Sequence, residues 1–266
     1  MRVFASVFKI HLKREFSYKS ALLSGLITQL FFGFMQISLY MAFLKSGNSD
    51  FTVGQMVSYI WLQQSFFGLF MFWDNQKYEI TEKIVKGDVG YHLIKPIGLY
   101  DYWFYNIFSK GVATSMLRSL PIILIGLCLP SKYALMFPQS IEGFVMFLLS
   151  MILGALLVSS VNTLSHIIVL YTLSPKGIFS FMVSVAGLLA GQVVPIPMLP
   201  KSVQKIFNFF PFRYVSDLPY RLYVGNISGL EGLKQIAIQF VWFVLILTIG
   251  KLILRKKVNA LAVQGG

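Results

Sequence analysis

Side chains that could perform catalysis or bind a metal are few in this sequence. The three histidines are widely separated along the chain, which argues against a zinc site. No G-x-S-x-G nucleophile motif occurs. Gly250 and Lys251 do not make a phosphate-binding loop, because Leu245 stands where that loop requires a glycine. We therefore expect no catalytic residue, metal or cofactor in this chain, and ATP, if it is used, would be bound by another chain.

A charged stretch at residues 80–103 stands out because apolar runs flank it on both sides. Residues 76–86 predict a short helix in which Glu79 and Lys83 form a favourable i,i+4 pair, and Gly87 supplies the helix stop. A soluble partner could bind such a helix, although an ordinary solvated loop helix is the alternative. The side chains expected at this contact are Tyr78, Glu79, Ile80, Glu82, Lys83, Ile84, Val85, Lys86 and Gly87.

Two stripes of small and polar residues predict faces at which helices pack against each other. Residues three or four positions apart share one side of a helix, and small residues let helix backbones approach closely in lipid. Glutamine is costly in lipid, so it would face either protein or a wet transport pathway. The stripes are Gly25, Gln29, Gly33, Gln36 and Tyr40 in one apolar run, and Ser180, Ser184, Gly187 and Gly191 in another.

Arg118 lies inside an apolar run, where an ionisable side chain is a candidate functional residue. It could line a transport pathway. Alternatively, the span is shifted outward and Arg118 reaches the inner headgroups with its long side chain. The sequence leaves both interpretations open.

The composition indicates a membrane protein. Hydrophobic residues make up 56% of the chain and charged residues 12%, whereas soluble domains carry about 25% charged residues. The net charge of +13 is typical of nucleic-acid binding, but basic residues also concentrate in the cytoplasmic loops of membrane proteins. We therefore expect membrane lipids, and not nucleic acid, as partners.

Six apolar runs predict an all-α polytopic membrane protein whose six transmembrane helices lie within residues 21–254. Residues 1–20 predict an interfacial amphipathic helix, with a solvated basic leader as the alternative. In that helix Phe4, Phe8, Leu12 and Phe16 recur every four residues, and Lys9, Lys13 and Arg14 lie on other faces. The six runs are residues 21–44, 53–73, 103–129, 141–170, 177–194 and 236–254.

The distribution of Lys and Arg predicts cytoplasmic termini, because most of these residues fall on the side of the N-terminus. Residues 75–102 then form a cytoplasmic loop and residues 255–266 a cytoplasmic tail. Residues 195–230 lie outside and are rich in proline and aromatic residues. They predict two short half-helices that re-enter the outer leaflet, since irregular backbone at membrane depth must be covered by protein or line a cavity.

The loop sequence resembles that of the permease subunits of ATP-binding cassette exporters of the ABC-2 type. The resemblance is carried by Glu82-Lys83-Ile84, Gly87-Asp88, Leu93-Ile94-Lys95-Pro96 and Tyr102-Trp103. It implies that residues 76–86 form a coupling helix that docks into a groove on a separate ATPase subunit. Ile80, Ile84 and Val85 would enter the groove, with the charged residues at its rim. ATP and Mg would be bound by that partner.

The resemblance further implies a transmembrane permease subunit of an exporter in the plasma membrane, paired with a second permease chain, the same or different. The aromatic content of 16% is compatible with an amphipathic or hydrophobic cargo such as a drug, lipid or modified peptide, but phenylalanine-rich spans that simply face lipid explain it better. Two other functions stay open. An ion- or proton-coupled secondary transporter would require an acidic residue within a span, and an intramembrane lipid-modifying enzyme would require clustered catalytic residues.

Overall fold

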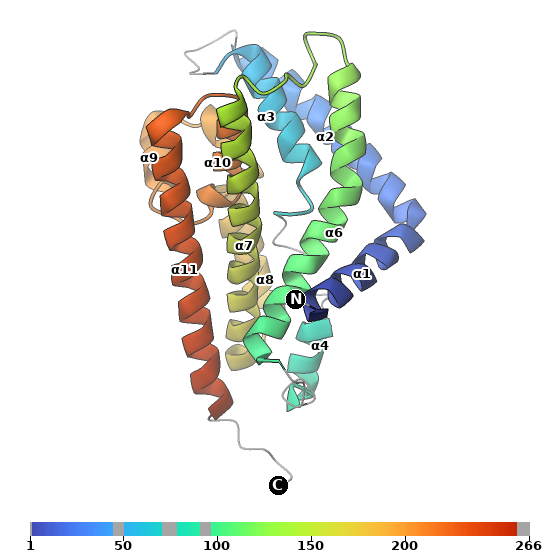
Figure 1. Ribbon diagram of the computed structural model, residues 1–266, viewed down its shortest axis with the longest axis vertical. Coiled ribbons are helices and arrows are strands. Elements are labelled where there is room, and N and C mark those ends of the chain that lie inside the picture. Colours follow the sequence, from blue (N-terminus) through green and yellow to red (C-terminus); the bar gives the residue numbers. More distant parts are fainter. Residues whose placement is uncertain (1, 45–50, 71–78, 91–96, 260–266) are drawn as a thin grey trace.

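The computed structural model describes residues 2–44, 51–70, 79–90 and 97–259, and the regular elements in these ranges are helices. Four of them are long and apolar enough to cross a membrane. They coincide with the predicted first, third, fourth and sixth spans, and the longest run roughly along the long axis of the molecule (Figure 1). These helices are α2 (Lys19–Leu44), α6 (Leu99–Cys128), α7 (Ile141–Thr172) and α11 (Gly229–Asn259). The prediction of an all-α membrane protein is confirmed.

The predicted second and fifth spans form shorter helices, α3 (Val53–Ser65) and α8 (Pro175–Leu189). Turns occupy residues 66–69 directly after α3, and the expected end of that span, Trp73, lies outside the described residues. Gly191 terminates α8, because its φ of 76° is the left-handed conformation that ends a helix. Hydropathy marks the apolar run but not the point at which the backbone leaves the helix. The total of six spans stays a prediction.

Two long helices begin earlier than the apolar runs that predicted them. α11 starts at Gly229 and not at 236, and α6 starts at Leu99 and not at 103. The additional residues at the start of α11, 229–235, include charged and polar side chains. Among them, Gln235 donates a hydrogen bond to Glu231, and the Lys234 ammonium lies 4.0 Å from the same carboxylate. Such i,i+3 and i,i+4 pairs support helix outside the apolar run.

The N-terminal helix α1 (Arg2–Ser17) packs along α6 and meets α2 at Tyr18 (Figure 1). Phe8 and Leu12 are partly buried, whereas Phe16 is 54% exposed. The amphipathic helix is therefore present. However, part of its apolar side faces protein, where the sequence predicted the membrane surface alone.

Residues 195–228 contain η2 (Ile196–Met198), α9 (Lys201–Phe207) and α10 (Arg213–Tyr223), gathered at the upper end of the bundle in Figure 1. Every residue of α10 is buried. Two short helices thus occupy the segment for which two half-helices were predicted, and their re-entry into a leaflet stays a prediction. The prolines separate them, since proline lacks the N–H that would continue a helix.

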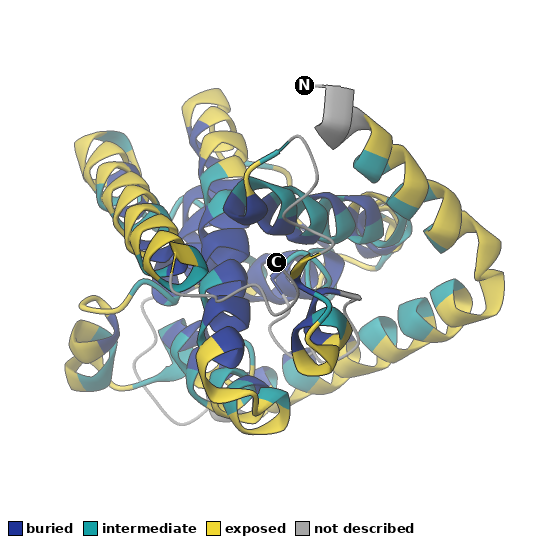
Figure 2. Ribbon diagram, turned by 90° about the horizontal axis from the view of Figure 1, so that it is seen from below, coloured by how far each residue is buried: buried dark blue, intermediate teal, exposed yellow. Residues whose placement is uncertain are grey.

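Two groups of buried apolar side chains form the core, one toward each end, and α7 contributes to both. The second group joins α7, α6 and the end of α11 to the short helix α4 (Glu79–Lys86), at the lower end in Figure 1. Seen from below, buried residues fill the middle of the bundle and exposed residues cover the outer faces of the peripheral helices (Figure 2). Many exposed residues are large and apolar, which suits a lipid surrounding.

Candidate functional site

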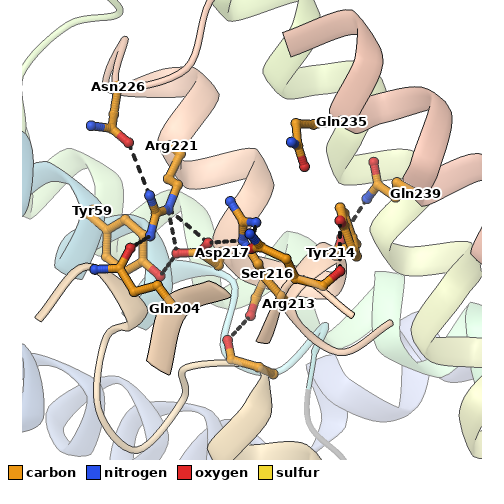
Figure 3. A network of polar contacts seen from close by, with 12 residues as sticks. Tyr59, Gln204, Arg213, Tyr214, Ser216, Asp217, Arg221, Asn226, Gln235 and Gln239 are labelled. Carbon is orange, nitrogen blue, oxygen red and sulfur yellow. Dashed lines mark hydrogen bonds and ion pairs between the residues drawn. The ribbon is translucent and has the colours of Figure 1, made fainter. Parts of the chain in front are cut away.

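A buried ionic network joins α10 to α3 (Figure 3). Arg213, Asp217 and Arg221 lie four residues apart and therefore share one face of α10. The Asp217 carboxylate is fully buried and lies 3.1 Å from Arg213 Nε and 2.8 Å from Arg221 Nε. The Tyr59 hydroxyl of α3 donates a hydrogen bond to Asp217 Oδ1 at 2.8 Å. Asp217 thereby connects two helices that are remote in sequence.

The network contains two positive charges and one negative charge. Neutral amide oxygens accept hydrogen bonds from the guanidinium N–H groups that do not face the carboxylate. Arg213 Nη1 donates a hydrogen bond to the Asn208 side chain. Arg221 donates to Gln204 at 3.2 Å and to Asn226 at 3.3 Å. Buried charges are tolerated when ion pairs and hydrogen bonds compensate them. The three amides bring the segments on either side of α10 into the same network.

Burial alone would raise the pKa of Asp217, but the guanidinium groups of Arg221 and Arg213 and the Tyr59 hydroxyl lower it below its ordinary value. The carboxylate is therefore ionised and has two cationic partners. Its partners are the two guanidinium groups and the Tyr59 hydroxyl, and no group of three or more metal-ligating side chains occurs in the described part of the chain. The arrangement is suited to holding α10 in place and not to acid–base catalysis.

Uncharged polar contacts extend this connection toward the centre of the bundle. Gln239 of α11 donates to the backbone oxygens of Tyr214 and Ser150, at 2.7 and 2.9 Å. Ser216 donates to the Ala190 oxygen at 2.8 Å. Gln63 of α3 donates at 2.8 Å to the oxygen of Gly191, just beyond α8. These side-chain hydrogen bonds connect α3 to the end of α8, and connect α10 to α11 and to the end of α8.

The predicted contact helix α4 is anchored within this chain. Ile80 and Ile84 are 1% and 2% exposed and pack in the second core group. The prediction that these two side chains enter a groove on a partner is therefore wrong, because the same face of the helix already covers the ends of α6 and α7. The exposed residues are Glu82, Val85, Lys86 and Gly87.

The remaining predicted contact residues are only partly described. Tyr78 and the Glu79 side chain lie outside the described residues, so the predicted Glu79–Lys83 pair is not placed. Lys83 is half-buried. An ion pair on this helix joins Lys86 Nζ to Glu82 Oε1 at 2.6 Å. Gly87 follows with a φ of 79° and ends the helix.

The stripe on α2 faces α3 and α6. A Cβ atom on Gly33 would lie 2.9 Å from the Trp61 ring, so the two helices approach closely only because this residue is a glycine. Gln36 accepts a hydrogen bond from Gln64 at 3.1 Å. Gln29 is partly buried, and a Cβ on Gly25 would lie 3.0 Å from the Arg118 guanidinium. Gln36 therefore bonds to a neighbouring helix of the same chain, which is the first of the two environments expected for a glutamine in this stripe.

The stripe on α8 is interrupted. Gly187 lies inside the helix and is buried, but Gly191 lies beyond its end. The N–H groups of Gly191 and Gln192 bond to the oxygens of Leu188 and Gly187, both at 3.0 Å, which is a Schellman helix end. Gly191 therefore does not continue the expected G-x-x-x-G packing face. Ser184 is exposed and bonds to the Ser180 oxygen one turn earlier.

Arg118 points toward α1. Its Nη2 atom lies 3.9 Å from the Glu15 carboxylate, which also accepts a hydrogen bond from Thr114 at 3.0 Å. His11, one turn before Glu15, bonds to Asn106 at 3.1 Å. These contacts fix α1 along one side of α6 and give Arg118 an acidic neighbour that neither sequence interpretation included.

The ionic network around Asp217 was missed by sequence reasoning, which placed its two arginines within residues 195–230 but gave them no role. The i, i+4, i+8 spacing of Arg213, Asp217 and Arg221 was the available signal, because it places all three on one helix face. Tyr59 could not be assigned to the network, since nothing in the sequence places α3 beside α10.

Comparison with known proteins adds one finding. Residues 23–265 match the family described as ABC-2 family transporter protein. No curated protein matches the chain.

Proposed function

The chain belongs to the ABC-2 family of transporter proteins, and on this premise we propose that it is the transmembrane permease subunit of an ATP-driven exporter. Separate ATPase subunits would bind ATP and Mg and drive it. The cargo would be amphipathic or hydrophobic, such as a drug, lipid or modified peptide. A second permease chain, the same or different, would complete the pathway.

The observation that carries this proposal is the way α4 is built into the fold. Its apolar face, with Ile80 and Ile84, is fixed to the core, while Glu82, Val85 and Lys86 are exposed at the end of the bundle. When one face of a helix is packed in the core and its other face is exposed, a partner bound to the exposed face can displace the helix. That displacement is transmitted to the helices packed against the buried face. The exposed face therefore serves as the ATPase contact, and the buried face as the mechanical connection.

α7 is the element that connects this contact to the opposite end. It packs against α4 near one end and against α10 toward the other, and α11 contacts it in both core groups. Interfaces of packed helices shift between discrete arrangements and do not deform continuously. A displacement of α4 on ATP binding would move α7 and, through it, the segment that Asp217 holds. In this mechanism no bond of the cargo is broken.

The proposal includes a location and a topology. The chain would lie in the plasma membrane with both termini in the cytoplasm and six spans, in which α3 and α8 are the short ones. α4 would face the cytoplasm, and η2, α9 and α10 would cap the outer end of the pathway. The clustering of α4 with the end of α11 at one end of the bundle supports this arrangement.

The rival functions receive less support. A proton-coupled transporter requires a carboxylate that changes its charge, and the buried carboxylate of Asp217 is held ionised by two arginines. An intramembrane enzyme requires a nucleophile beside a base, and the buried polar contacts described above join helices to one another and to their flanking segments.

The decisive experiment is purification from native membranes in a mild detergent, followed by mass spectrometry. We expect an ABC ATPase subunit to copurify, and reconstituted vesicles to export cargo only with ATP. If no ATPase copurifies and an ion gradient alone drives transport, the exporter proposal is refuted.

A further inference from the structure

The charges of α1 are segregated by the way it packs. Lys9, Lys13 and Arg14 are exposed, and among the described residues no ion pair involves them. Glu15, the acidic residue of this helix, is turned toward α6, where Thr114 and Arg118 hold it. Among the described side chains of α1, the charged groups on its exposed side are therefore all cationic, although the helix also contains an acidic residue.

Large apolar side chains are interspersed with these cations. Ile10 is 63% exposed, Phe16 54% and Tyr18 61%. At about 100° per residue, Ile10 falls between Lys13 and Arg14, and Phe16 falls beside Lys9. A surface that alternates basic and apolar groups suits the boundary between headgroups and acyl chains, where lysine stems lie in apolar surroundings and their ammonium groups reach the phosphates.

The same side of the protein continues onto α2 without interruption. Leu23, Ile27 and Phe31 of α2 are each about 60% exposed, and α2 is a candidate membrane span. Figure 2 shows the outer faces of α1 and α2 forming one exposed border of the molecule, away from the buried centre. A surface continuous with a lipid-facing span is placed to contact lipid and not a soluble protein.

We propose that this basic face, formed by Lys9, Ile10, Lys13, Arg14 and Phe16 of α1 and by Tyr18 directly after it, binds the headgroups of anionic phospholipids. The cations would pair with the phosphates, and the three apolar side chains would insert beside them. Sequestering Glu15 against Arg118 removes the one acidic group that would repel an anionic headgroup. The proposal depends on membrane residence alone and holds whatever the protein transports.

The test uses the full-length protein carrying Cys128→Ser and Ser17→Cys, labelled with bimane at position 17, an exposed position on α1. It is reconstituted into vesicles that mix phosphatidylcholine with phosphatidylglycerol, one of the two being brominated to quench the dye. We expect brominated phosphatidylglycerol to reach half-maximal quenching at a lower mole fraction than brominated phosphatidylcholine. The ratio of the two mole fractions defines the preference, which should be at least about fivefold. The preference should fall as salt is raised.

Two triple variants distinguish the basic face from charge in general. Lys9→Gln with Lys13→Gln and Arg14→Gln should bring the preference close to one. Lys201→Gln with Lys205→Gln and Lys234→Gln removes three exposed cations at the other end of the bundle and should leave it unchanged. Equal quenching by both lipids in the parent protein would overturn the proposal. A preference that is unchanged in the α1 variant would also overturn it. If that variant in addition loses a copurifying ATPase, the face binds an acidic protein and not lipid.

Discussion

Tyr59 of α3 donates its hydroxyl to Asp217 of α10, with the oxygens 2.8 Å apart and both residues buried. The two lie 158 positions apart in the sequence. The bond is the link between α3 and an ionic network that otherwise joins α10 to its own flanking segments. Asp217 consequently connects α10 and its flanking segments to α3.

Replacing Asp217 with Asn should strongly destabilise the protein. Arg213 and Arg221 would remain buried without their counter-charge, a change that costs on the order of 3–5 kcal/mol. Thermal unfolding in detergent, followed by size-exclusion chromatography, measures it. Glu231→Gln is the matched control, because Glu231 pairs with Lys234 on an exposed surface and such pairs contribute about 0–1 kcal/mol. Equal melting temperatures for the two variants would contradict this role of Asp217.

The stability contributed by Asp217 should also depend on pH. Its pKa is lower in the folded protein than its ordinary value of 3.8, so the contribution is fully present above that value and is lost as the pH falls below it. The difference in melting temperature between the parent protein and Asp217→Asn should therefore shrink as the pH is lowered from 7 toward 3. A difference that stays constant across this range would show that the carboxylate is not the ionised partner.

Gly191→Ala and Gly187→Ala should have opposite effects. Gly191 has a left-handed φ, and a Cβ there would lie 2.8 Å from Ile196 Cγ1, so we expect a loss of about 1–3 kcal/mol. Gly187 is inside α8, where a Cβ meets only Gln192 Oε1 at 4.0 Å. Alanine there should be neutral or stabilising by up to about 1 kcal/mol. Parallel thermal melts compare them, and equal losses would indicate that both glycines serve a packing face after all.

Gly33→Leu should separate α2 from α3. Even a Cβ at this position would lie 2.9 Å from the buried Trp61 ring, and overpacking of this kind costs about 1–3 kcal/mol. Ser38→Leu, at an exposed position of the same helix, adds a similar volume without a clash and should be mild. A cysteine pair linking α2 to α3 would report the separation as a reduced cross-linking yield, whereas an unchanged yield would argue against close packing here.

The two faces of α4 should separate folding from ATPase binding. Val85→Asp changes an exposed side chain and should leave the protein folded but weaken copurification of the ATPase. Ile84→Asp places an unpaired carboxylate in the core and should impair folding itself. Val193→Asp, at an exposed valine after α8, is the control for an added surface charge. Membrane yield, monodispersity and ATPase recovery are measured for all three.

If Val85→Asp retains full ATPase binding and transport, the exposed face of α4 is not the docking surface. The exporter proposal would then have to rest on copurification alone.

The sequence by itself determined the membrane environment, the long apolar helices, the short helix at residues 79–86 and the family resemblance. Each follows from local composition, from periodicity or from a short motif, and none requires knowing which helices are neighbours. The faces of α2 were also readable, because the small and polar residues of that stripe repeat at helical spacing.

Only the tertiary structure decided what those faces meet. Ile84 reads as an exposed apolar contact in the sequence, yet the ends of α6 and α7 cover it. Gly191 reads as part of a helical stripe, but its left-handed backbone places it beyond the helix. Arg118 acquires Glu15 and Asp217 acquires Tyr59 from helices remote in sequence. Burial and charge pairing depend on distances between elements, which a hydropathy pattern does not encode.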